Sequence, residues 1–103
     1  MAWFMTRVEL HDASYQDYVS LHGYMTAEGY TTTIRGGDGK TYQLPPAEYN
    51  LDGSYTCDHA LEKAQRAAQK TKKKFAVVVA EYTGASWVGL ETVQPARPAV
   101  RSF

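Results

Sequence analysis

The sequence predicts a single domain of the α+β class, and three observations lead to this prediction. At 103 residues the chain has room for one hydrophobic core. Residues 15–28 and 58–72 repeat apolar side chains at helical spacing. The other segments alternate or are apolar over lengths typical of strands, with turn residues between them. The domain is expected to span residues 1–94, with a flexible, proline-containing tail over 95–103.

The first predicted strand covers residues 3–10. Its sequence alternates, so one face carries Phe4, Thr6, Val8 and Leu10, while the intervening side chains share the other face.

The first predicted helix covers residues 15–28. Either Asp12 or Ser14 can cap its start, and Asp17 stands three residues after Ser14, as a capping box requires. The apolar positions recur at helical spacing and define the face expected to be buried: Tyr18, Leu21 and Met25.

A hairpin is predicted next. Residues 30–35 are rich in threonine and suit a strand, residues 36–39 are the strongest turn signal in the chain, and 40–44 resume an extended pattern. Pro45 and Pro46 cannot donate to a sheet, so they interrupt the second arm before residues 47–51 extend again.

The second predicted helix covers residues 58–72, with Asp58 as its cap. Its core-facing stripe is expected to be Leu61, Ala64, Ala68 and Thr71. Four lysines follow at its end, where they complement the helix dipole: Lys70, Lys72, Lys73 and Lys74. A solvated helix end is favoured for them over a patch that contacts RNA.

Residues 75–82 form the most apolar run and predict a central strand, and 86–93 offer a further C-terminal edge strand. The order of elements is βαββαβ with that extra strand. This order predicts a ferredoxin-like two-layer sandwich, in which two helices cover one face of an antiparallel sheet.

Composition excludes some classes of protein and counts against others. Eleven basic residues balance eleven acidic ones, whereas a dedicated nucleic-acid binder is usually basic. Cys57 is the single cysteine, so no internal disulfide and no zinc site built on several thiols can form. The sequence contains neither a secretory signal pattern nor an apolar run long enough for a membrane span. A cytoplasmic protein without a membrane partner is expected.

The end of the first strand is the candidate catalytic site. Asp12 can hold a divalent metal such as Mg²⁺ or orient an attacking water, and the neighbouring His11 can transfer protons. The alternative is that Asp12 only caps the first helix.

A candidate RNA-binding surface follows from the aromatic and basic residues of the strands. Tyr30 and Tyr42 can stack on bases, while Arg7, Arg35 and Lys40 can hold the RNA backbone. Tyrosines on half-exposed sheets are also ordinary structural residues, so that alternative stays open.

Over residues 3–93 the order and spacing of short blocks resemble the GhoS family of small bacterial proteins. The blocks are Phe4-x-Thr-x-Val8, Asp12-Ala-Ser-Tyr15, Gly29-Tyr30, Asp38-Gly39-Lys40, Leu44-Pro-x-Ala-Glu-Tyr49 and Leu61-Glu-Lys-Ala64.

The resemblance implies a ferredoxin-like fold and an endoribonuclease that acts as the antitoxin of a type V toxin–antitoxin pair by cutting the toxin's messenger RNA. It also implies a role for Asp12, because small CRISPR-associated nucleases of similar fold have an aspartate at this place that is linked to metal-dependent cleavage. The competing hypothesis is a non-catalytic module that binds RNA or protein, or forms a homodimer, through its open sheet face or an edge strand.

Overall fold

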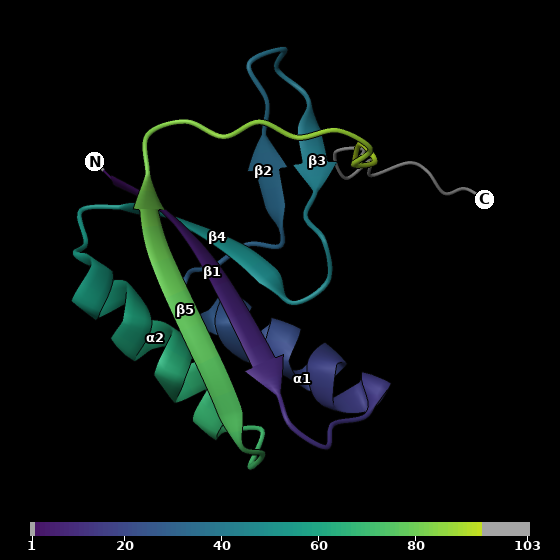
Figure 1. Ribbon diagram of the computed structural model, residues 1–103, viewed down its shortest axis with the longest axis vertical. Coiled ribbons are helices and arrows are strands. Elements are labelled where there is room, and N and C mark those ends of the chain that lie inside the picture. Colours follow the sequence, from purple (N-terminus) through teal and green to yellow (C-terminus); the bar gives the residue numbers. More distant parts are fainter. Residues whose placement is uncertain (1, 94–103) are drawn as a thin grey trace.

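The computed structural model describes residues 2–93 (Figure 1). Residues 95–103, for which a flexible tail is predicted, lie outside the described part. In chain order the elements are β1 (Ala2–Leu10), α1 (Tyr15–Ala27), β2 (Thr33–Arg35), β3 (Thr41–Gln43), β4 (Glu48–Gly53), α2 (Cys57–Gln69) and β5 (Phe75–Tyr82). None of the helices in residues 2–93 is long and apolar enough to cross a membrane.

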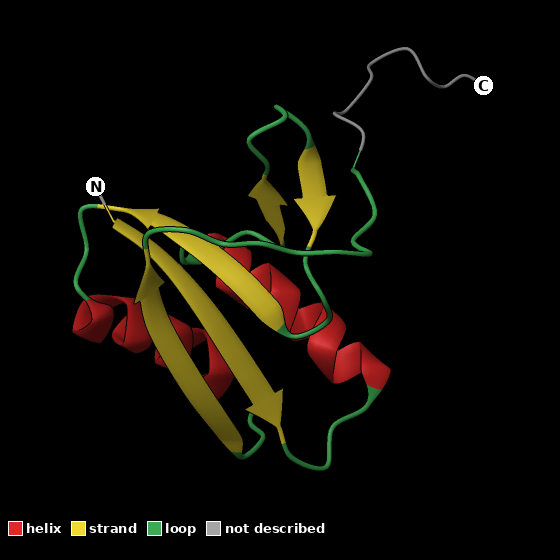
Figure 2. Ribbon diagram, turned by 45° about the horizontal axis from the view of Figure 1, so that its top comes forward, coloured by secondary structure: helices red, strands yellow, loops and turns green. Residues whose placement is uncertain are grey.

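The main layer is an antiparallel sheet with the strand order β4-β1-β5, so β1 is the central strand. Both helices lie against one face of this sheet, as the two ribbon views show (Figures 1 and 2). The other face, called the outer face below, carries no helix of the described chain. The predicted α+β fold is confirmed, and the arrangement is compatible with a ferredoxin-like sandwich.

The alternation predicted for β1 is confirmed, because Phe4, Thr6, Val8 and Leu10 are all buried. The register places Phe4 opposite Leu51 of β4, and Thr6 opposite Tyr49. Directly opposite residues share a face, so β4 contributes its apolar side chains to the same core.

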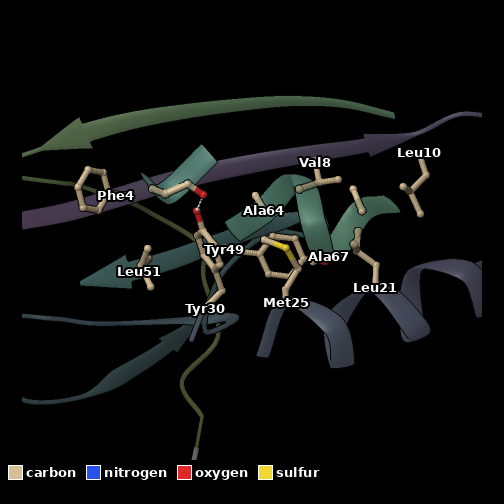
Figure 3. Close-up of a cluster of buried hydrophobic side chains, with 12 residues drawn as sticks. Phe4, Val8, Leu10, Leu21, Met25, Tyr30, Tyr49, Leu51, Ala64 and Ala67 are labelled. Atoms are coloured by element: carbon tan, nitrogen blue, oxygen red, sulfur yellow. Dashed lines mark hydrogen bonds between the residues drawn. The ribbon is translucent and has the colours of Figure 1, made fainter. Parts of the chain in front are cut away.

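The helices complete the core (Figure 3). Leu21 and Met25 of α1 are fully buried, whereas α2 buries only small side chains, which allow its axis to approach the sheet closely: Ala60, Ala64, Ala67 and Ala68. The stripe predicted for α2 is therefore partly wrong. Leu61 is 37% exposed, and Thr71 lies beyond the last residue of the helix.

Serine and threonine cap the two helices. The Ser14 side chain accepts from the Asp17 backbone N–H, and the Asp17 carboxylate accepts from the Ser14 N–H, so the capping box is confirmed. Asp12 is not the cap. In α2 the cap is Thr56 instead of the predicted Asp58, which occupies the first turn and complements the helix dipole there.

β2 and β3 pair with no other strand of the described fold and form a separate two-stranded sheet. The predicted turn closes this hairpin, with the Gly36 N–H donating to the Lys40 carbonyl at 2.7 Å. The hairpin joins the main sheet at one bridge, where Thr31 and Asn50 exchange two backbone hydrogen bonds of 2.8 Å.

The edge strand predicted over residues 86–93 is wrong. This segment makes one isolated bridge, between Thr92 and Tyr42 of β3, and Gly89 interrupts it with a φ of +86°. The segment crosses over the outer face of the sheet and reaches the hairpin (Figure 2). Apolar side chains of the segment, the hairpin and β1 line a groove there: Met5, Ile34, Leu44, Trp87 and Leu90.

Candidate functional site

The backbone at the end of β1 joins the loop that follows α2. The His11 N–H donates to the Lys74 carbonyl at 2.8 Å, which continues the pairing of β1 with β5 by one residue. Because of this bond, Lys74, at the end of the lysine-rich segment 70–74, lies beside His11. We call His11, Asp12 and Lys74 the β1-end site.

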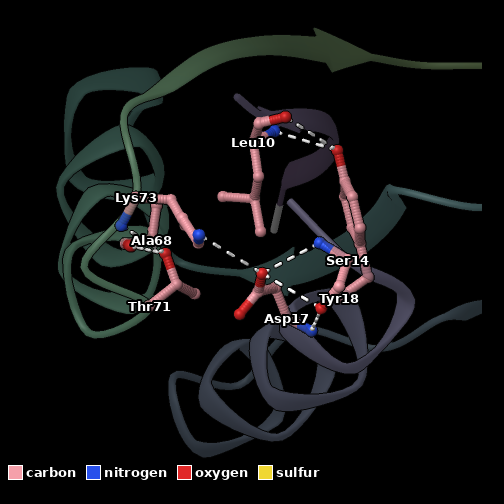
Figure 4. Close-up of polar contacts among 7 residues, drawn as sticks. All are labelled: Leu10, Ser14, Asp17, Tyr18, Ala68, Thr71 and Lys73. Carbon is pink, nitrogen blue, oxygen red and sulfur yellow. Dashed lines mark hydrogen bonds and ion pairs between the residues drawn. The ribbon is translucent and has the colours of Figure 1, made fainter. Parts of the chain in front are cut away.

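α1 holds the same strand end from the other side (Figure 4). The Tyr18 hydroxyl accepts from the Leu10 N–H at 2.9 Å and donates to the Leu10 carbonyl at 3.3 Å. Ser14 caps α1 immediately after the connection. The connection between Leu10 and Ser14 is therefore fixed at both of its ends.

Lys73 ties the lysine segment to α1. Its Nζ lies 3.7 Å from Oδ2 of Asp17 (Figure 4). The Asp17 carboxyl has a lowered pKa, chiefly because the Ser14 N–H donates to it, with smaller contributions from the Ser14 hydroxyl and from Lys73. Thr71 secures the segment further, since its hydroxyl donates to the Ala68 carbonyl at 2.7 Å and accepts from the Lys73 N–H at 3.3 Å.

His11 and Asp12 are both exposed at this site. The His11 Nε2 lies 3.6 Å from Oε1 of Glu9. Asp12 has a φ of +52°, in the left-handed region that aspartate and asparagine tolerate better than most residues. The turn that presents Asp12 therefore accounts for its residue type without a cap, and an asparagine can replace it there.

A metal at this site would depend on very few protein ligands. Within residues 2–93, no three histidine, cysteine, aspartate or glutamate side chains lie close enough to share an ion. Mg²⁺ is usually held by one or two carboxylates, with waters and substrate phosphates completing its shell. Asp12 fits that pattern as a single carboxylate ligand, with RNA supplying the phosphate.

Three of the predicted RNA-binding residues lie elsewhere. Arg35, Lys40 and Tyr42 belong to the β2–β3 hairpin, at the opposite end of the molecule from the β1-end site (Figure 1). The Tyr42 hydroxyl donates to Oδ2 of Asp38 at 2.6 Å, and its ring meets Trp87 edge to face at 5.3 Å. The hairpin is thus a second exposed surface, separate from the β1-end site.

Arg7 lies between these two surfaces. It points to the outer face of β1, where its guanidinium lies 3.8 Å from the Glu48 carboxylate, and its side chain is 66% exposed. An exposed pair of this kind is weak, so Arg7 remains available to a phosphate.

The prediction for Tyr30 is wrong. Its ring is 1% exposed and lies inside the core, so it cannot stack on a base. Gly29, with a φ of +99°, turns the chain directly after α1 and aims Tyr30 inward. The hydroxyl donates to the Ala60 carbonyl at 2.8 Å and accepts from Thr6 at 3.0 Å.

Sequence reasoning missed the lysine segment as part of the site. The lysines were visible, but their position at a helix end already accounted for them through the dipole. Only the long-range bond from His11 to Lys74 brings the end of the segment to this end of β1. The sequence matches no protein-family model and no curated protein.

Proposed function

We propose that the protein is an endoribonuclease of the antitoxin type, which cleaves messenger RNA at the β1-end site. The observation that carries the proposal is the hydrogen bond between His11 and Lys74, since it joins the strand end that carries an exposed imidazole and an exposed carboxylate to an exposed lysine. The resemblance to the GhoS family supports RNA as the substrate.

The residues of the site divide the chemistry between them. The exposed Lys74 and, two residues before it, Lys72 hold the scissile phosphate and its neighbours. Lys70 lies over the Tyr24 ring of α1 and is not assigned to the site. His11 transfers a proton to or from an oxygen of the reacting phosphodiester. Asp12 holds Mg²⁺ or orients the attacking water, and the metal would stabilise charge on the phosphate oxygens.

The decisive experiment compares wild-type protein with Asp12→Asn. Both are incubated with mixed RNA, with and without Mg²⁺, and the products are separated on a sequencing gel. The matched control is Asp58→Asn, which removes an exposed carboxylate at the far end of α2. We expect discrete cuts by wild type and by the control, and none by Asp12→Asn.

Folding of the variants is checked separately by circular dichroism. Ser14 caps α1, and asparagine suits the left-handed turn, so Asp12→Asn is expected to fold like wild type. Intact RNA after incubation with well-folded wild-type protein would contradict the proposal and favour a non-catalytic binding module. Equal cleavage by Asp12→Asn would remove Asp12 from the mechanism.

A further inference from the structure

β5 is an open edge of the main sheet. In the described chain it pairs with β1 alone, over eight residues from Phe75 to Tyr82. In an antiparallel strand, about half of the backbone N–H and C=O groups point away from the existing partner. β5 therefore presents a row of these groups along its free side.

This edge lacks the usual protection against pairing. Natural edge strands carry prolines, charges or bulges, or are very short. The first six residues of β5, 75–80, are all apolar, and Glu81 is the first charge. Val78 is 66% exposed at the middle of the strand.

The opposite edge of the sheet is different. At β4, Asn50 already exchanges two backbone hydrogen bonds with Thr31. The Asn50 side chain also accepts a hydrogen bond of 2.6 Å from the Tyr82 hydroxyl. Pairing through β5 alone uses one edge per copy, so it closes at two copies and does not continue into a filament.

We propose that two copies of this chain pair through β5, antiparallel, about a two-fold axis at Val78. In this register Val78 lies opposite itself, Ala76 opposite Ala80 and Val77 opposite Val79. Opposite residues share a face, so small and branched apolar side chains meet on both faces of the joined sheet.

The charges at the two ends of β5 complement this arrangement. Lysines precede the strand at Lys73 and Lys74, and Glu81 lies near its end. Antiparallel pairing brings the lysines of one copy toward Glu81 of the other, and the two-fold axis repeats the contact. The result is a sheet of two joined three-stranded halves, with both pairs of helices on the same face.

Oligomeric mass is the first test. Light scattering during size exclusion, over a series of protein concentrations, should give twice the chain mass for the wild type. Val78→Lys places like charges opposite each other at the axis and should give the monomer mass. The matched control is Val88→Lys, which changes a valine that is 95% exposed and outside β5, and it should stay dimeric.

Disulfide trapping tests the register. In a Cys57→Ser background, which removes the exposed native thiol, Val78→Cys should oxidise to a covalent dimer. Opposite Cα atoms in antiparallel strands are about 4.5–5.5 Å apart, within the range of a disulfide. Ala76→Cys alone should not cross-link, whereas a mixture of Ala76→Cys and Ala80→Cys should.

Two outcomes would overturn the proposal. One is a wild-type protein that remains monomeric at every concentration. The other is cross-linking of Ala76→Cys alone as efficiently as Val78→Cys, which would show random collision instead of a fixed register.

Discussion

Tyr30 shows how a single polar group is accommodated in a small core. Its hydroxyl lies between the Thr6 side chain, which donates to it, and the Ala60 carbonyl, which accepts from it. These contacts connect α2 with the central strand, β1, through Tyr30, which lies three residues after the end of α1. Burying a polar group costs little free energy only while the group keeps its hydrogen-bond partners.

Replacing Tyr30 with phenylalanine should therefore destabilise the fold. The change leaves the Thr6 hydroxyl buried without this partner, and we expect the free energy of unfolding to fall by about 1–3 kcal/mol. Urea denaturation measures the loss. Adding Thr6→Val removes the unpaired hydroxyl. The double variant should therefore lose less unfolding free energy than the two single variants lose together. Strictly additive losses would contradict the coupling.

His22 and Tyr49 form a second pair with a consequence for pH. The Tyr49 hydroxyl lies 2.6 Å from Nδ1 of His22. Burial raises the pKa of Tyr49, so it remains a phenol that shares this hydrogen bond with the imidazole. Burial also lowers the pKa of His22.

The lowered pKa of His22 predicts a loss of stability in mild acid. Above about pH 6.5, the ordinary histidine value, His22 is neutral in both the folded and the unfolded chain. As the pH falls below that value, the unfolded chain takes up the proton first, so stability declines through the folded-state pKa. Urea midpoints across this range should fall more for wild type than for His22→Gln. His59→Gln, at an exposed histidine, should keep the wild-type dependence.

At the scale of elements, the caps decide where the helices begin. Ser14 and Asp17 satisfy two backbone N–H groups at the start of α1. Ser14→Ala removes the side-chain acceptor, and we expect a loss of about 1 kcal/mol in unfolding free energy. Asp12→Asn, two residues earlier, should cost much less. Equal losses in thermal or urea denaturation would contradict the assignment of the cap.

The helices and β1 were predictable because their signals are local. Alternation in residues 3–10 identified the buried side of β1, and helical spacing located α1 and α2. Choosing Ser14 over Asp12, or Thr56 over Asp58, required the actual backbone angles, because each pair of neighbours offers suitable oxygens. Alanine gives a weak apolar signal, so the prediction chose Leu61 in place of its buried neighbour Ala60 and omitted the buried Ala67.

At the scale of the whole molecule, contacts between distant residues were the least predictable. The fold class followed from element order. The burial of Tyr30, the detached hairpin and the neighbours of Asp12 all depend on pairings that no local pattern encodes. The sequence therefore located the candidate site at Asp12 and His11 but missed its lysine. It also assigned RNA binding to hairpin residues, which lie at the other end of the molecule's longest axis (Figure 1).

This separation predicts different roles for the two basic surfaces. Lys72→Gln with Lys74→Gln should slow cleavage of bound RNA, because Lys74 belongs to the β1-end site and Lys72 precedes it by two residues. Arg35→Gln with Lys40→Gln should leave the rate at saturating RNA unchanged and only weaken binding. Each lost phosphate contact should reduce the slope of log affinity against log salt by about 0.7. Equal effects of both pairs on the saturated rate would contradict two separate surfaces.

The central place of β1 has a consequence for synthesis on the ribosome. β1, the first strand of the described fold, pairs on one side with β4 and on the other with β5, the last strand of the described fold. Both strands that pair with β1 are therefore translated after it, and the sheet is complete only when β5 has been made. A pause in translation after β4 would leave one edge of β1 unpaired.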